Sequence, residues 1–141
     1  MKLFLAAPFS SRVDSLGNVE PAYRQSMEQL IASLREHEHQ VFCALEYAGW
    51  KMGGLSAAEE EFKHDLQEID AAEKMLVLLE ERLSAGAQLE IGYAFAKNKR
   101  LQIYQIGTPA WSNAAFSRLS GHEIRAVQDI DDFATQVIAN N

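Results

Sequence analysis

Two alternating patterns of apolar and polar residues run along the chain and predict its fold. Short runs of consecutive apolar residues are typical of parallel strands covered on both faces, and the clearest run is 75–79. Between such runs, apolar residues recur every three or four positions, as at Met27, Leu30, Ile31 and Leu34, which is typical of helices. The chain therefore mixes strands and helices along its whole length.

The predicted elements alternate from strand to helix. Strands are expected at 2–7, 40–45, 75–79, 101–104 and 123–127, and helices from Pro21, from Ser56 to about Ala72, from Ala87 to Lys97, at 114–119 and from Asp129. This alternation predicts a three-layer α/β domain with an open, flavodoxin- or Rossmann-like sheet of about five, mostly parallel strands. No repeat or linker divides the chain, so residues 1–141 are expected to form one domain.

Polar residues mark the starts of two helices. Ser56 and Glu59 fit a capping box, in which each side chain bonds a free backbone N–H of the first turn. Asp129 is expected to cap the last helix in the same way. The acidic run 59–61 is interpreted as charge that complements the helix dipole.

One carboxylate interrupts an apolar helix. The helix at 87–97 is apolar almost all round, so we expect it to lie deep in the fold. Glu90 shares its face with the small residues Gly86 and Ala87, which leave room for a ligand to approach. Because burying a lone carboxylate is costly, Glu90 should be paired, hydrogen-bonded or functional.

A second carboxylate is placed to face inward from the preceding helix. Phe62, Leu66 and Ile69 define the apolar face of that helix, and Asp65 falls within about 60° of it at 100° per residue. Two carboxylates in different environments are what glycosyl transfer at an anomeric carbon uses. Whether Asp65 meets Glu90 depends on how the two helices pack.

The loops that follow the strands should gather at one edge of the sheet. In open parallel sheets, ligands bind beyond the carboxyl ends of the strands. The loops expected there are 8–12, 46–55, 80–86 and 106–109. Phe9 is a candidate wall for a nucleobase, whereas Trp50 and Tyr47 either stack on a base or cap the core.

Composition and charge narrow the possible partners. The net charge of -7 argues against a nucleic-acid polymer but not against a mononucleotide, which needs only a few local donors. Cys43, the single cysteine, excludes an internal disulfide and fits a reducing compartment. No apolar run reaches membrane length, so we expect a cytoplasmic protein without membrane association. The histidines show no metal-ligand spacing, and neither a metal nor a cofactor is predicted.

The segments around the two carboxylates resemble the nucleoside 2-deoxyribosyltransferase superfamily. The resemblance combines Asp-Leu-x-x-Ile at 65–69 with Glu-x-Gly-Tyr-Ala-x-Ala at 90–96, and the run 3–9 is similar to the family's first strand and nucleobase loop. It covers most of residues 1–106. It implies a flavodoxin-like, usually oligomeric domain that cleaves N-glycosidic bonds.

The resemblance also implies roles for single residues. Glu90 matches the nucleophile, which would attack C1′ and form a covalent glycosyl ester, and Asp65 matches the carboxylate that assists proton transfer at the base. Further substrate-binding positions implied by the resemblance are Phe4, Ala6, Pro8, Phe9 and Gly86. The plainer alternatives are an ordinary buried acid at Glu90 and a solvated helix acid at Asp65.

Ser84 departs from the pattern of the base-exchanging transferases. Those enzymes carry an acid six residues before the nucleophile, which holds a free 5′-hydroxyl, whereas a serine at a helix start can bind a phosphate. The chain therefore resembles the branch that hydrolyses nucleoside 5′-monophosphates, although Ser84 alone also fits a plain helix cap. Ser10, Arg12 and Ser117 would be further phosphate ligands, Ser117 from a neighbouring subunit of a homodimer or higher homo-oligomer. Arg12 fits a simple surface charge equally well.

A second departure is Phe4, where many members carry a tyrosine near the nucleophile. Cytidylate hydrolases resemble this pattern and accept ribonucleotides, so the 2′ substituent of the sugar stays open. The resulting hypothesis is an N-glycosidase that hydrolyses a nucleoside 5′-monophosphate to free base and ribose or deoxyribose 5-phosphate. The alternatives are a base-exchanging deoxyribosyltransferase and a non-catalytic nucleotide-binding module.

Other α/β classes fit poorly. A phospho-acceptor receiver domain needs acids after the first strand, where this chain has Ala6, Ala7 and Pro8. A dinucleotide-binding domain needs a Gly-x-Gly-x-x-Gly turn there, which is also absent. The non-enzymatic alternative is therefore restricted to a module that senses nucleotides without cleaving them.

Overall fold

Five parallel strands form the centre of the structure, a computed structural model that describes all residues from 1 to 141. The strands are β1 (Lys2–Ala6), β2 (Gln40–Cys43), β3 (Lys74–Leu79), β4 (Arg100–Ile106) and β5 (Ile124–Val127). Their order in the sheet is β2-β1-β3-β4-β5, and every neighbouring pair is parallel. The predicted open α/β sheet is confirmed, and it contains no antiparallel strand.

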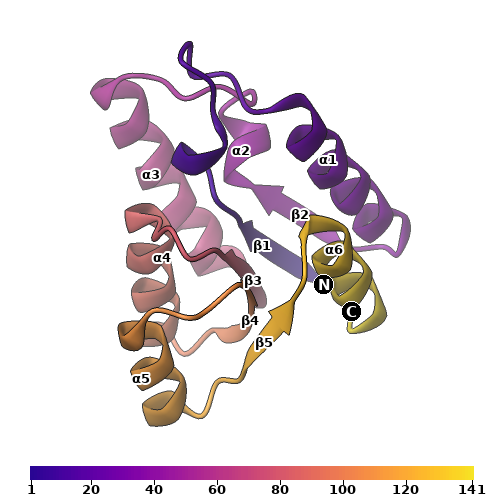
Figure 1. The fold of residues 1–141 in the computed structure, drawn as a ribbon, viewed down its shortest axis with the longest axis vertical. Coiled ribbons are helices and arrows are strands. Elements are labelled where there is room, and N and C mark those ends of the chain that lie inside the picture. The colour runs from indigo at the N-terminus through magenta and orange to yellow at the C-terminus, as the bar shows by residue number, and fades with distance from the viewer.

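Helices cover both faces of this sheet and complete the three layers (Figure 1). On one face lie α1 (Pro21–Glu36) and α6 (Ile130–Ala139), and on the other lie α3 (Leu55–Ala71), α4 (Ala85–Ala96) and α5 (Trp111–Ser120). Two short elements follow the first two strands: the 3-10 helix η1 (Ser10–Arg12) and α2 (Ala44–Tyr47). None of the helices combines the length and the apolar composition that a membrane crossing requires.

The central strand divides its side chains between two hydrophobic clusters. All six residues of β3 are buried, as its continuous apolar run predicted. Leu76 and Leu78 pack into the cluster beneath α1 and α6, and Met75 and Val77 pack into the cluster beneath α3 and α4. Burial on both faces fixes β3 and, with it, the helices that flank it.

Two predictions about helix starts have different outcomes. Asp129 caps α6 as expected, because its Oδ1 accepts a hydrogen bond of 2.8 Å from the backbone N–H of Asp132. The capping box at Ser56 and Glu59 is wrong: α3 begins one residue earlier, at Leu55, with Gly54 at the N-cap and no capping side chain. Ser56 consequently lies inside the first turn, where its hydroxyl cannot reach the amides that a cap serves.

The expectation that the helix at 87–97 lies deep in the fold is also wrong. Only one side of α4 packs on the sheet, and Leu89 and Phe95 on its outer side are 62% and 41% exposed. An apolar helix surface left open to water is a feature of contact sites rather than of a core.

Some element boundaries differ from the predicted ones. The strand expected to reach Leu45 ends at Cys43, and residues 44–47 form α2, whose single turn is too short to show a period in sequence. The helix expected at 114–119 begins three residues earlier, at Trp111.

The strand order creates a switch point between β1 and β3. From β1 the chain crosses by α1 to β2 on one side, and from β3 it crosses by α4 to β4 on the other. The loops at the carboxyl ends of these two strands therefore diverge, and in open α/β sheets this crevice is where ligands bind.

Backbone hydrogen bonds between two loops shape one wall of that crevice. The segment 13–20 pairs with residues 50–52: the Val19 N–H donates to the Trp50 carbonyl at 2.9 Å, and the Met52 N–H donates to the Gly17 carbonyl at 2.7 Å. Gly17 has φ +80°, and a Cβ placed on it would lie 2.9 Å from the Met52 carbonyl oxygen. Residue 17 must therefore be glycine for both conformational and steric reasons.

We expect Gly17→Ala to lower the free energy of unfolding by about 2–3 kcal/mol, because it adds a clash with the Met52 carbonyl to a strained φ. Gly49→Ala is the matched control, since Gly49 has φ +72° but open space around it, and it should cost about 1 kcal/mol. Urea denaturation measures both values. Equal losses for the two variants would contradict a rigid contact between Gly17 and Met52.

Candidate active site

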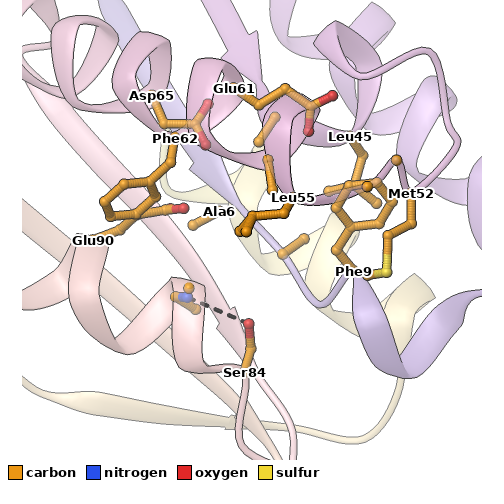
Figure 2. Close-up of a pocket in the computed structure, with 17 residues that line it drawn as sticks. Ala6, Phe9, Leu45, Met52, Leu55, Glu61, Phe62, Asp65, Ser84 and Glu90 are labelled. Atoms are coloured by element: carbon orange, nitrogen blue, oxygen red, sulfur yellow. Dashed lines mark hydrogen bonds between the residues drawn. The ribbon is translucent and has the colours of Figure 1, made fainter.

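A cavity of about 360 Å³ opens at the switch point, between α3 and α4 (Figure 2). Its wall is mostly apolar and comes from four parts of the chain: Ala6, Ala7 and Phe9 after β1; Ala44, Leu45, Met52, Gly53 and Gly54 after β2; Leu55, Ala58, Glu61, Phe62 and Asp65 of α3; and Ser84, Gly86, Ala87 and Glu90 around the start of α4. An apolar cavity with a few polar groups is the usual form of a small-molecule site.

Glu90 reaches the cavity from the second turn of α4. Its residue is only 7% exposed, and no hydrogen bond or ion pair within the chain involves its carboxylate. The small residues Gly86 and Ala87 precede it on the same side of the helix and also line the cavity, as their spacing predicted. Burial, followed by the charge of Asp65, raises the pKa of Glu90 to about 8.

Asp65 faces Glu90 from α3. Its residue is 6% exposed, and its buried Oδ1 has no hydrogen-bond partner. Burial raises the pKa of Asp65 to about 7, with a smaller contribution from the charge of Glu61 one turn earlier. In Figure 2 the carboxylates of Asp65 and Glu90 lie at the same end of the cavity, beside the ring of Phe62. The two predicted carboxylates therefore line the same cavity.

Ser84 lies at the start of α4 and lines the cavity. Its Oγ accepts a hydrogen bond of 3.3 Å from the backbone N–H of Ala87, so Ser84 is the N-cap of the helix (Figure 2). The same hydroxyl keeps its own proton for a ligand, and the positive end of the helix dipole points toward the cavity. The cap is observed, and the binding of a phosphate stays a prediction.

The first loop contributes less of the wall than the resemblance implied. Ala6 and Phe9 line the cavity, but Phe4 and Pro8 do not. Phe4 is fully buried in β1 and stacks on Phe42 with ring centroids 5.4 Å apart. Pro8 is also buried, and its carbonyl accepts a hydrogen bond of 2.8 Å from the Tyr23 hydroxyl. Both residues support the loop from behind.

Three of the predicted phosphate ligands lie away from the cavity in this chain. The guanidinium of Arg12 forms an ion pair with Glu80, directly after β3, and packs 5.0 Å from the centre of the Tyr23 ring. Ser10 is exposed to solvent. Ser117, on α5, donates a hydrogen bond of 2.6 Å to the carbonyl of His122. No lysine or arginine lines the cavity.

The wall also contains residues that the sequence reasoning did not select. Met52 and Leu55 come from the long connection between β2 and α3, whose path no local pattern reveals. Glu61 was interpreted only as helix-dipole charge, yet it lines the cavity. Its position four residues before Asp65, and thus on the same face of α3, is the signal that could have found it.

The aromatic residues Trp50 and Tyr47 lie outside the cavity. Trp50 is buried in the core beneath α1, which confirms the second of its two interpretations. Tyr47 is exposed and stacks on His64, with ring centroids 4.2 Å apart. No group of three or more histidine, cysteine, aspartate or glutamate side chains is arranged to hold a metal ion.

The raised pKa of Glu90 makes stability depend on pH. The unfolded chain releases this proton near pH 4.5, whereas the folded chain keeps it until about pH 8, so stability falls as the pH rises through that interval. Replacing Glu90 with glutamine removes this loss. We expect the stability of Glu90→Gln relative to wild type to increase from pH 5 to pH 8, by at most about 1.4 kcal/mol per pH unit.

Urea denaturation at pH 5, 6, 7 and 8 measures this difference. Glu59→Gln, at an exposed position of α3, is the control and should run parallel to wild type over the same range. A constant difference between Glu90→Gln and wild type would show that Glu90 ionises in the folded protein as it does in water.

Comparison with known proteins identifies structures of the same fold. A scan against protein-family models finds no match, and a search of curated proteins finds none either. Among solved structures, the CMP N-glycosidase BcmB of Clostridium botulinum is 16% identical, with a TM-score of 0.68 over 97% of this chain and 98% of that one. The solution structure of BlsM is 22% identical, with a TM-score of 0.67 over 98% and 87%.

A third neighbour is a 2-deoxyribosyltransferase from Bacillus psychrosaccharolyticus, which is 19% identical, with a TM-score of 0.62 over 95% of this chain and 90% of that one. The alignments with these three structures span nearly the whole chain, including the region beyond residue 106 where the sequence resemblance was weak. The fold that the sequence resemblance implied is thereby confirmed: this chain has the same fold as a named N-glycosidase and a named deoxyribosyltransferase.

Proposed function

We propose that this protein is an N-glycosidase of the nucleoside 2-deoxyribosyltransferase superfamily, which hydrolyses a nucleoside 5′-monophosphate to free base and ribose or deoxyribose 5-phosphate. The observation that carries this proposal is the pair of buried carboxylates, Asp65 and Glu90, which have no partner in the chain and face one cavity. The shared fold and the two motifs at 65–69 and 90–96 support the same conclusion.

In the first step, a carboxylate oxygen of Glu90 attacks C1′ of the sugar. The bond between C1′ and the base nitrogen breaks, and its electron pair leaves with the base. Asp65 in its protonated form supplies the proton that the departing base requires. The products of this step are free base and a glycosyl ester on Glu90.

In the second step, water resolves the ester. The Asp65 carboxylate takes a proton from the water, whose oxygen attacks C1′ and displaces Glu90 as a carboxylate. The sugar phosphate leaves with a hydroxyl on C1′, and Asp65 has regained its proton. If the nitrogen of a second base attacks in place of water, the same site exchanges bases.

The electrostatics of the site suit this cycle. Burial raises the pKa of Asp65 to about 7 and that of Glu90 to about 8, so the pair keeps at least one proton near neutral pH. One proton is what the first step requires, with Glu90 ionised as nucleophile and Asp65 protonated as acid.

The preference for a nucleotide is supported by the start of α4. Ser84 and the amide-bearing first turn of the helix face the cavity where the transferases carry an acid, and a helix N-terminus favours an anionic group. Base exchange between nucleosides is the second candidate. It is favoured by the cavity wall itself, which contains three carboxylates but no lysine or arginine to neutralise a phosphate.

We further propose that the protein works as a cytoplasmic homodimer. The outer surfaces of α4 and α5 carry exposed apolar side chains, among them Leu89, Phe95, Leu119 and the 93% exposed Trp111. These two helices lie side by side on one face of the molecule (Figure 1). Ser117 belongs to α5, so a partner docked on this face could bring its own Ser117 to the neighbouring cavity.

Base release tests the carboxylate pair. Incubation with ribo- and deoxyribonucleoside 5′-monophosphates should liberate free base, which chromatography detects. Glu90→Ala should lower the rate by about 10³-fold or more, since it removes the nucleophile. Asp65→Asn should lower it by about 10²- to 10⁴-fold, the usual contribution of a general acid.

Glu60→Gln, on the exposed side of α3, is the matched control and should retain the wild-type rate. Base release that persists in Glu90→Ala would exclude the covalent mechanism. No release from any nucleotide or nucleoside would favour the non-catalytic module.

Substitution of Ser84 tests the choice between nucleotide and nucleoside. Ser84→Asp keeps a helix-capping side chain but places a negative charge where the phosphate would lie. We expect kcat/KM for nucleoside monophosphates to fall by at least about 10-fold while kcat/KM for the matching nucleosides stays the same or rises. Unchanged turnover of monophosphates would show that the phosphate does not contact residue 84.

A further inference from the structure

Glu61 is a carboxylate of the cavity wall to which the proposed mechanism gives no part. It lies on α3, one turn before Asp65, and is half-buried. No hydrogen bond or ion pair within the chain involves its side chain, although Lys63 and His64 lie on the same helix two and three residues away. An acceptor left free on a cavity wall is available to a ligand.

The two ends of the cavity differ in chemistry. Asp65 and Glu90 lie at one end, whereas Phe9, Leu45 and Met52 lie toward the other, and Glu61 extends from α3 toward this apolar end (Figure 2). With C1′ at Glu90, the base must project away from the sugar. The apolar end offers nonpolar side chains against which a base ring can pack.

Glu61 is the only charged residue at the apolar end of the cavity wall. A carboxylate accepts hydrogen bonds and donates none. An exocyclic amino group on the base would donate a hydrogen bond to the Glu61 carboxylate. A carbonyl oxygen at the same position is itself an acceptor and would repel the carboxylate. Glu61 can therefore distinguish cytosine from uracil and adenine from hypoxanthine, which differ in this group and in the protonation of the ring nitrogen beside it.

A second observation is that the chain supplies few hydrogen-bond donors to the carboxylates of this cavity. Asp65, which also lines the cavity, is only 6% exposed, and its buried Oδ1 has no hydrogen-bond partner in the chain. The wall supplies no lysine or arginine to either carboxylate. A donor for Glu61 must therefore arrive with the ligand, and an amino-bearing base carries one on the edge that faces away from its sugar.

We propose that Glu61 is a specificity-determining residue, which accepts a hydrogen bond from the exocyclic amino group of the substrate base and selects amino-bearing bases over their oxo counterparts. This inference rests on the proposed function, because that function sets the sugar at Glu90 and the base at the apolar end.

Glu61→Gln tests the inference, since it keeps the size of the side chain and replaces one acceptor with a donor. Two matched pairs of nucleotides serve as probes: the monophosphates of cytidine and uridine, and those of adenosine and inosine. The ratio of kcat/KM for the amino base to kcat/KM for the oxo base should fall about 10- to 100-fold, the usual value of one hydrogen bond to a charged group. Glu60→Gln is the control and should leave both ratios unchanged.

A binding measurement separates this inference from the proposed chemistry. Isothermal titration of the same nucleotides into Glu90→Gln, with and without Glu61→Gln, reports base preference in a protein that cannot form the ester. Loss of the amino preference in the double variant supports the role of Glu61 even if no base is ever released, an outcome that would overturn only the proposed reaction.

Equal ratios in wild type and Glu61→Gln, in both turnover and binding, would overturn the inference. In that case Glu61 acts only through its charge on Asp65, and Glu61→Gln should shift the pH profile of all four nucleotides by the same amount.

Discussion

Two carboxylates held out of water, close enough to feel each other's charge, are the constraint on which this structure depends. A buried acid normally has a lysine, an arginine or several N–H donors beside it, because an uncompensated charge is expensive in a medium of low polarity. Asp65 and Glu90 have none of these within the chain. They reduce the cost by holding a proton instead, which brings both pKa values close to neutrality. The same proton is the one that a departing base needs.

The fold keeps this unfavourable pair in place by attaching each acid to a helix that is fixed by its core. Ile69 follows Asp65 by one turn, and Ile91 is the next residue after Glu90, and both isoleucines are buried in the cluster beneath α3 and α4. That cluster rests on β3, which is covered on both faces. The acids can therefore neither turn toward bulk water nor separate without disrupting packing in the centre of the molecule.

Most of the fold and the two acids could be predicted from the sequence because their signals are local. The unbroken apolar run of β3 indicated its central place, and the face of Phe62, Leu66 and Ile69 selected Asp65. The isolated polar position in α4 selected Glu90. These inferences need only the period of a strand or a helix.

The remainder of the site depends on contacts between distant parts of the chain. The periodic pattern of apolar residues within one strand or helix does not reveal such contacts. Arg12 was assigned to a phosphate, but its partner Glu80 is 68 residues away in sequence and is met only when η1 packs beside the end of β3. Met52 and Leu55 reach the cavity because their connection is tied to the loop around Gly17. The outer surface of α4 was predicted to be buried, because sequence alone does not distinguish an apolar contact surface from an apolar core.

The connection between β2 and α3 has a consequence for how such a protein diversifies. Residues 52–54 form cavity wall but belong to no strand or helix, and their backbone is joined to the rest of the chain chiefly through the bond from Met52 to Gly17. Exchanges at Met52, unlike those at Gly53, where a Cβ would lie 2.8 Å from the Cβ of Ala57 on α3, would reshape the cavity wall while α3 and α4 stay where the sheet holds them. Proteins with this fold can thus change the ligand that they bind through one short segment of the chain while Asp65 and Glu90 stay the same.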